Sequence, residues 1–356
     1  MQKQIIFFIV ILIFFQACIS QPKFSEEEKK IAMPINNISY YTSSFQKLNQ
    51  LLTLSKQPNY KFQVKTIENL SSATGTMPTD SRGFLRTPLI LHMNALQVIA
   101  YEPIYNKWET KTTGFIYFPK MKDVMPDLVI NGAVTQFDKG IISENDNFDI
   151  DAEFGSGRGE SDLRFDNDRS DDLSQIALDL NIFKYQDRRY ISGVATQNKI
   201  EIHRKRKKNR FGLFLNGSGI GYSKYSTLQQ SKDEALRILS EFSLLQLLGR
   251  LYQVPYWKCV TPNLKVDELI MKKKINRFNQ ASKELKIKLI ERTIKFYGYN
   301  ITIDGKFSQQ EINTLKKIKE VYQLKNDIKL LSSFYEELYL AAPFFTEEIK
   351  LERKKV

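Results

Sequence analysis

Histidine and cysteine are scarce in this chain of 356 residues, and their positions argue against catalysis. The two histidines are His92, in an apolar stretch where we expect a core side chain, and His203, within a basic run. No Ser/His/Asp set, Cys/His pair or metal-ligand spacing accompanies them. Asp149, Asp151 and Glu153 alternate along the chain but lack the loop glycine of a calcium site. We therefore expect no enzyme, no catalytic residue and no metal.

A long hydrophobic segment is also missing. Residues 5–15 are eleven apolar residues, too few to span a bilayer as a helix. Ala17 and Cys18 follow this run and resemble the lipobox of a bacterial lipoprotein. The sequence thus predicts a signal peptide at residues 1–17 and a lipidated Cys18, with an ordinary secretory signal and an incidental cysteine as the alternative.

Lipidation of Cys18 has two consequences. Several acyl chains, at ~0.8 kcal/mol per buried methylene, give stable anchoring, and the covalent lipid is the one attached group that we expect. Ile19 stands where an aspartate would favour retention at the inner membrane, so an outer-membrane location is favoured, with the main domain facing the periplasm. Cys259 is then left without a disulfide partner, and we expect it to be a buried, small apolar residue.

Positive charge exceeds negative charge by 13, which favours an acidic partner or surface. The densest basic run, residues 203–210, could bind nucleic acid, but the lipoprotein signal places it outside the cytoplasm, so we expect no nucleic-acid partner. With 42% hydrophobic and 26% charged residues, the chain has enough apolar surface for a globular body of two small domains.

A central sheet is predicted by three segments. Residues 127–138 form an apolar, β-branched strand, with Gly132 at a point of close backbone approach. Residues 176–184 form a second strand, a polar turn at 186–188 follows it, and residues 190–196 return. Residues 60–70 read as the first strand, and further segments are expected as a turn-rich loop at 71–88, a short helix at 89–101 and a strand at 113–118.

Two charged hairpins are predicted beside this sheet. Residues 141–172 carry eleven carboxylates, and apolar residues alternate with polar ones on either side of a glycine turn at 155–157. Residues 197–222 are basic and end in a glycine string that lacks the features of a phosphate loop. Such alternation is typical of membrane β-barrel strands. A soluble surface hairpin or a flexible acidic loop is the alternative for the first segment.

Helices are predicted in the last third of the chain. Residues 231–252 have helical apolar spacing, and Ser231 and Glu234 form a capping box. Residues 263–356 are lysine-rich and helical. Within them, residues 289–299, 304–308 and 311–324 resemble the three-helix peptidoglycan-binding module, with Ser308 and Glu311 at capping-box spacing. A plain helical hairpin is the alternative.

The order of these segments resembles the CsgG family of outer-membrane secretion channels, known from curli export. The matching pieces are residues 62–71, 128–134, 173–182, 192–196 and 219–222, followed by the capped helix. The resemblance implies a ring of identical subunits, each of which adds two hairpins to one shared barrel. It implies an α+β fold, with residues 18–57 as a lipidated tether, 58–262 as the CsgG-like domain with hairpins near 139–175 and 192–222, and 263–356 as an all-α module.

The resemblance also implies a function: an outer-membrane lipoprotein channel that exports protein subunits. A turn-rich loop after the first strand narrows the channel in the family, which makes Arg82 and Phe84 the candidates for the constriction. In a closed barrel the acidic and basic hairpins would alternate, so Asp149, Asp151 and Glu153 would face Arg204, Arg206 and Lys208. The alternative function is a non-pore structural lipoprotein that braces an envelope machine and binds peptidoglycan.

The anchor can be tested directly. Cys18→Ala should leave an unlipidated precursor and abolish outer-membrane fractionation, because the acylated sulfur is lost. Metabolic labelling with palmitate measures this, and an unlabelled wild-type protein would contradict the predicted lipidation.

Overall fold

The computed structural model describes residues 41–71, 80–100, 125–138, 143–146, 169–205, 208–215, 218–220, 231–261 and 264–344. All of them belong to one compact unit, residues 39–356. The fold mixes helices with a single eight-stranded sheet, which confirms the predicted α+β class at that level. None of the helices in the described ranges is long and apolar enough to cross a membrane.

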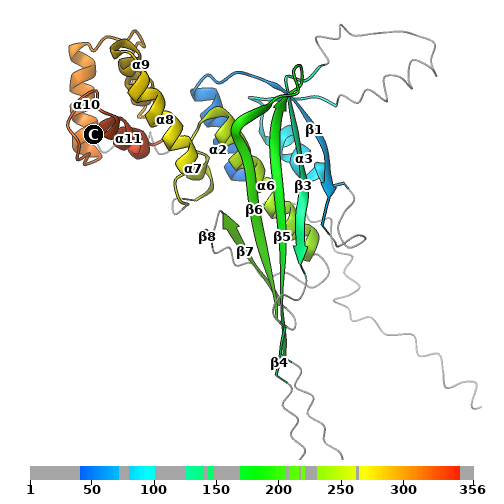
Figure 1. The fold of residues 1–356 in the computed structure, drawn as a ribbon. Helices are drawn as coiled ribbons and strands as arrows, with labels where there is room; N and C mark the ends of the chain where they lie inside the picture. The colour runs from blue at the N-terminus through cyan, green and yellow to red at the C-terminus, as the bar shows by residue number, and fades with distance from the viewer. Residues whose placement is uncertain are drawn as a thin grey trace, which may run out of the picture. The chain divides into compact units, whose positions relative to one another are not determined.

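The sheet has the order β2-β1-β3-β5-β6-β7-β8, and β4 pairs with β5 beyond the end of β3 (Figure 1). β1 is parallel to both β2 and β3, and the other pairs are antiparallel. The strands are β1 Lys61–Asn69, β2 Gln97–Val98, β3 Leu128–Asp138, β4 Ser143–Asp146, β5 Arg169–Lys184, β6 Tyr190–Lys205, β7 Lys208–Leu215 and β8 Ser218–Ile220.

The predicted central strands are confirmed, and β5 and β6 prove longer than expected. Each has 16 residues, and the predicted turn lies between them, where Arg188 takes a left-handed conformation with φ 58°. On β3, Gly132 pairs with Leu180. A Cβ at Gly132 would overlap the Asp179 carbonyl oxygen and lie 2.7 Å from Leu180 Cδ2, so the close backbone approach is confirmed.

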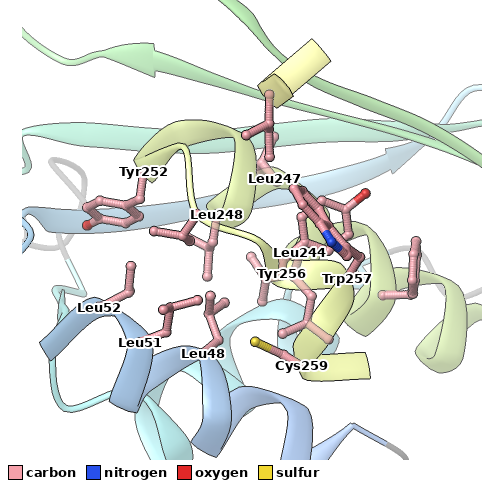
Figure 2. Close-up of a cluster of buried hydrophobic side chains, with 14 of the residues drawn as sticks. Leu48, Leu51, Leu52, Leu244, Leu247, Leu248, Tyr252, Tyr256, Trp257 and Cys259 are labelled. Atoms are coloured by element: carbon pink, nitrogen blue, oxygen red, sulfur yellow. The ribbon is translucent and has the colours of Figure 1, made fainter. Parts of the chain in front are cut away.

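One face of the sheet is covered by α6, Ser231–Tyr252, which has the predicted bounds. Leu244, Leu247 and Leu248 of α6 are completely buried, and α2, Thr42–Leu54, packs against α6. Figure 2 shows Leu248 facing Leu48, Leu51 and Leu52 of α2, whereas Leu247 points away from α2. Trp257 and Cys259 of α7, Tyr256–Val260, complete this core, as expected for Cys259. The predicted Ser231–Glu234 capping box stays a prediction.

Two expectations for the first hundred residues are wrong. Residues 42–54, expected to be tether, form α2, whose Phe45, Leu48 and Leu51 are fully buried. Residues 82–88, expected to lie in a loop, belong to helix α3, Arg82–His92. The helix expected at 89–101 ends at His92. Pro88 suggested a break, yet it lies inside α3, on the buried face with Leu85 and Leu89. Burial of that apolar face offsets the lost helical hydrogen bond. The strand expected at 113–118 lies outside the described residues.

The C-terminal part is helical in its described residues, as predicted, with four helices where the resemblance implied three. They are α8 Glu268–Gln280, α9 Lys283–Lys295, α10 Gln309–Val321 and α11 Ser332–Ala341. The capping box of α10 is confirmed, because the Ser308 side chain accepts the Glu311 N–H and the Glu311 carboxylate accepts the Ser308 N–H.

Gly132 gives a test of the sheet. Gly132→Ala should lower the free energy of unfolding by about 1–3 kcal/mol, the usual cost of overpacking, because backbone rather than a mobile side chain blocks the new methyl group. Chemical denaturation of the detergent-solubilised chain measures the change. Gly83→Ala is the matched control: it lies in α3, its Cβ would meet nothing within 4 Å, and it should not destabilise the protein. Equal effects of the two substitutions would contradict the packing argument.

Candidate functional site

The candidate site begins with four consecutive antiparallel strands, β4-β5-β6-β7. β5 pairs with β3 from Gln175 to Lys184 and with β4 from Arg169 to Asp172. Its other side pairs with β6. The strands run past the end of α6 in Figure 1, and β4 lies on this extension. In the described backbone β4 pairs with β5 and β6 with β7. The turn predicted at 155–157 and the strands beside it lie outside the described residues, so the hairpins stay a prediction.

The register places acidic and basic positions opposite each other within one chain. Asp171 pairs with Lys205 and Asp172 with Arg204 across β5 and β6. Within one chain, the β5 neighbour of Arg204 is Asp172, and the expected pairing of the two segments in a ring stays a prediction. Lys208 pairs with Lys205 across β6 and β7. Asp149, Asp151, Glu153 and Arg206 lie outside the described residues.

Polar side chains lie on the face of β5 and β6 opposite the isoleucines of the core. Gln175 donates to Glu201 at 2.9 Å, and Lys199 donates to Gln175 at 3.3 Å. The Lys199 ammonium lies 3.9 Å from the Glu201 carboxylate. Further along, burial raises the pKa of Asp179. This face of the hairpins is therefore polar, whereas Ile176, Ile200 and Ile202 fill the core face.

A buried ion pair joins the end of α6 to the start of α8. Arg250, near the end of α6, donates through Nε to Asp267 Oδ2 at 2.8 Å, and the two side chains are only 7% and 2% exposed. The other Asp267 oxygen caps α8 by accepting the N–H groups of Leu269 and Ile270 at 3.0 and 3.4 Å. Arg250 also donates to the carbonyl of Ala195 on β6. One pair thus fixes the start of α8 against a central strand.

A chain of buried hydrogen bonds also connects β6, α6 and α7 to Asp267. Asn198 of β6 donates to Ser243 and to Gln246 of α6, both at 2.9 Å. Gln246 donates to the Tyr256 hydroxyl at 3.1 Å, and that hydroxyl donates to Asp267 at 3.1 Å. Burial, and next the charge of Asp267, raise the pKa of Tyr256 well above its usual value, so its hydroxyl remains a donor.

Two lysines add further contacts, one from α7 to the end of α11 and one from α8 to β6. Lys258 of α7 donates to the carbonyls of Leu340 and Ala342 at the end of α11, at 2.6 and 2.9 Å. Lys273 of α8 donates to the carbonyl of Ser192 on β6 at 2.9 Å. Lysine ammonium groups therefore bind backbone carbonyls at the end of α11 and on the strand beside α8.

The loop that resembles the peptidoglycan-binding module is built around Glu291. This carboxylate is fully buried and accepts the Gly305 N–H at 3.0 and 3.2 Å. Gly305 has φ +85°, and a Cβ there would lie 2.5 Å from the Glu284 side chain. Burial raises the pKa of Glu291, although the Gly305 N–H opposes this shift. The predicted turn at 304–308 is thus held by a buried acceptor that sequence reasoning missed.

The predicted constriction residues lie on a helix rather than on a loop. Arg82 begins α3 and pairs with Asp80 at 2.6 Å. The Arg237 guanidinium of α6 lies 5.0 Å from the centre of the Phe84 ring. The constriction role of both stays a prediction. Cys18 lies outside the described residues. No group of three potential metal ligands occurs within the described part of the chain.

Sequence reasoning also missed the ion pair at the junction. The available signal was Arg250 itself, a charge inside the apolar run Leu247-Leu248-Gly249-Arg250-Leu251. A lone charge in such a run needs a partner, but Asp267 lies 17 residues away beyond a second helix.

Comparison with known proteins gives no close relative. No family model and no curated protein matches this chain. Among solved structures, lipoprotein GNA1162 from Neisseria meningitidis aligns with TM-score 0.21 and 12% identity, over 42% of this chain and 85% of that one. A putative neuraminyllactose-binding hemagglutinin homolog from Helicobacter pylori aligns with TM-score 0.23 and 13% identity, over 55% and 84%. These distant likenesses carry no functional argument.

The junction can be tested by a double-mutant cycle. Arg250→Met should lower the free energy of unfolding by about 3–5 kcal/mol, because it leaves the Asp267 charge buried and unpaired. Asp267→Asn should lower the free energy of unfolding less in the Arg250→Met variant than in the wild type. In that variant it removes a charge that is buried without a partner. Lys288→Met, at the exposed pair with Glu284, is the control and should leave the unfolding midpoint unchanged. Strictly additive effects at Arg250 and Asp267 would contradict the coupling.

Proposed function

We propose that this chain is one subunit of an oligomeric outer-membrane lipoprotein, a CsgG-type channel that secretes protein subunits of curli-like or related surface structures. Its lipid at Cys18 would lie in the outer membrane and its main domain would face the periplasm. Its partners would be copies of itself, membrane lipid and the exported protein.

The observation that supports this proposal best is the set of strands β4 to β7 that continues beyond the helix-covered sheet. In the described part of the chain, β4 pairs only with β5, and β7 pairs with β8 only at Leu213–Leu215. Unpaired strand edges favour pairing with another chain. Pairing β7 of one copy with β4 of the next is a head-to-tail contact, which closes into a ring if the rotation allows.

The charges on the two outer strands are complementary. Glu144 and Asp146 stand at alternate positions of β4, and Lys208 and Arg210 stand at alternate positions of β7. Alternate positions share one face of a strand. Opposite charges on facing strands stabilise a pair and like charges destabilise it, so β4 would accept β7 of a neighbour better than another β4.

The alternative function is a non-pore structural lipoprotein that braces an envelope machine and binds peptidoglycan. The turn and the capping box around Ser308 favour it, since they have the geometry expected from the resemblance to the wall-binding module. The firm attachment of this module to the sheet domain would transmit load from the wall.

Charge reversal at the proposed seam tests the ring. Lys208→Glu with Arg210→Glu should block assembly, because β7 would then repel β4 of the next copy. Adding Glu144→Lys with Asp146→Lys should partly restore it. Assembly of the wild type should weaken with salt, since the Debye length falls from ~10 Å at 0.1 M to ~3 Å at 1 M. Native gels and electron microscopy of detergent-extracted particles measure assembly.

The matched control reverses two exposed lysines of α10, Lys316→Glu with Lys317→Glu, which changes the net charge equally and should leave the ring intact. Normal rings from the β7 variant would count against the seam. Particles without rings or conductance in the wild type would favour the bracing function.

A further inference from the structure

We infer that the groove between the end of α6 and helices α8 and α9 binds an acidic peptide segment of a partner protein. The groove has a volume of about 560 Å³, within the range of ligand sites. Its lining residues are Gln253, Lys273, Asn276, Arg277, Gln280, Ala281 and Leu285.

The groove has a polar stripe along α8. Lys273, Asn276, Arg277 and Gln280 follow the spacing i, i+3, i+4 and i+7, which places them on one face of the helix. This side of α8 lies away from its buried residues Ile270, Met271 and Phe278, as is usual for the polar side of an amphipathic helix. Here it carries two cations, which can only donate hydrogen bonds, and two amides, which both donate and accept. Such a stripe fits a ligand with carboxylates and peptide groups.

The negative charge that would complete this site is missing from its lining. None of the seven lining residues is acidic. Glu284, beside the groove in sequence, is paired with Lys288 at 2.5 Å. Arg277 forms no ion pair within the described residues, and its planar fork suits bidentate binding of a carboxylate. Lys273 is held in place by the Ser192 carbonyl and retains further N–H donors.

Gln253 supports a binding role because its backbone favours another residue. It follows α6 with φ 54°, a left-handed conformation where glycine is preferred. The Val254 N–H donates to the Gly249 carbonyl at 3.0 Å and fixes this helix end. Gln253 therefore contributes an amide to the groove from the end of α6.

The dimensions limit the ligand. Seven steps along a helix, from Lys273 to Gln280, span roughly 10 Å at 1.5 Å per residue. An extended peptide rises about 3.3 Å per residue, so about three residues fit along the stripe. A segment with carboxylates at alternate positions would present them on one side, toward Lys273 and Arg277.

Fluorescence anisotropy with the full chain in detergent tests this site. The probe is a fluorescein-labelled hexapeptide in which glutamate alternates with serine, and its glutamine analogue is the control ligand. The wild type should bind the glutamate peptide about tenfold more tightly than the analogue, the effect expected of a charge-assisted bidentate contact. Arg277→Gln should remove that preference, whereas Arg292→Gln, an exposed arginine of α9 outside the groove, should retain it.

Gln253→Gly separates binding from stability. It should keep or raise the midpoint of denaturation, because glycine suits the left-handed position, yet weaken peptide binding about two- to tenfold through the lost amide. Equal affinities for Arg277→Gln and Arg292→Gln would overturn the proposal, as would equal binding of both peptides. Binding of a purified wall muropeptide but not of the glutamate peptide would also overturn it. Ring formation is not needed for this measurement, so its outcome is independent of the proposed channel.

Discussion

The buried pair of Arg250 and Asp267 is the contact on which the arrangement of this protein depends. Both charges are removed from water, which is costly unless each is fully hydrogen-bonded. Here Asp267 accepts hydrogen bonds from Arg250, Tyr256 and the first turn of α8, while Arg250 also reaches a carbonyl of β6. These two side chains therefore hold the end of α6 to the start of α8, and Arg250 also binds both to β6.

That central strand connects the two regions for which functions are proposed. β6 is tied to α6 through Ala195 and Asn198 and to α8 through Ser192, and it reaches the basic positions of the outer hairpin at its end.

Local patterns predicted β3, α6 and the α10 cap correctly, because each depends on neighbours within a few residues. The Ser308–Glu311 box is an example, because both of its hydrogen bonds join residues three positions apart. The errors at α2 and α3 arose where local signals misled. Pro88 and Gly83 argued for a loop, and the apolar stripe of α2 gains its stabilisation only when α6 covers it.

The sequence by itself determined the strands, the long buried helix and the division of charge between an acidic and a basic segment, since periodicity and composition are properties of the chain alone. Only the tertiary structure decided which positions lie next to each other. Asp171 and Asp172 are in register with Lys205 and Arg204 on the neighbouring strand. Arg250 of α6 pairs with Asp267 at the start of α8, although 17 residues separate them. Partners distant in the chain are chosen by packing, which no local pattern records.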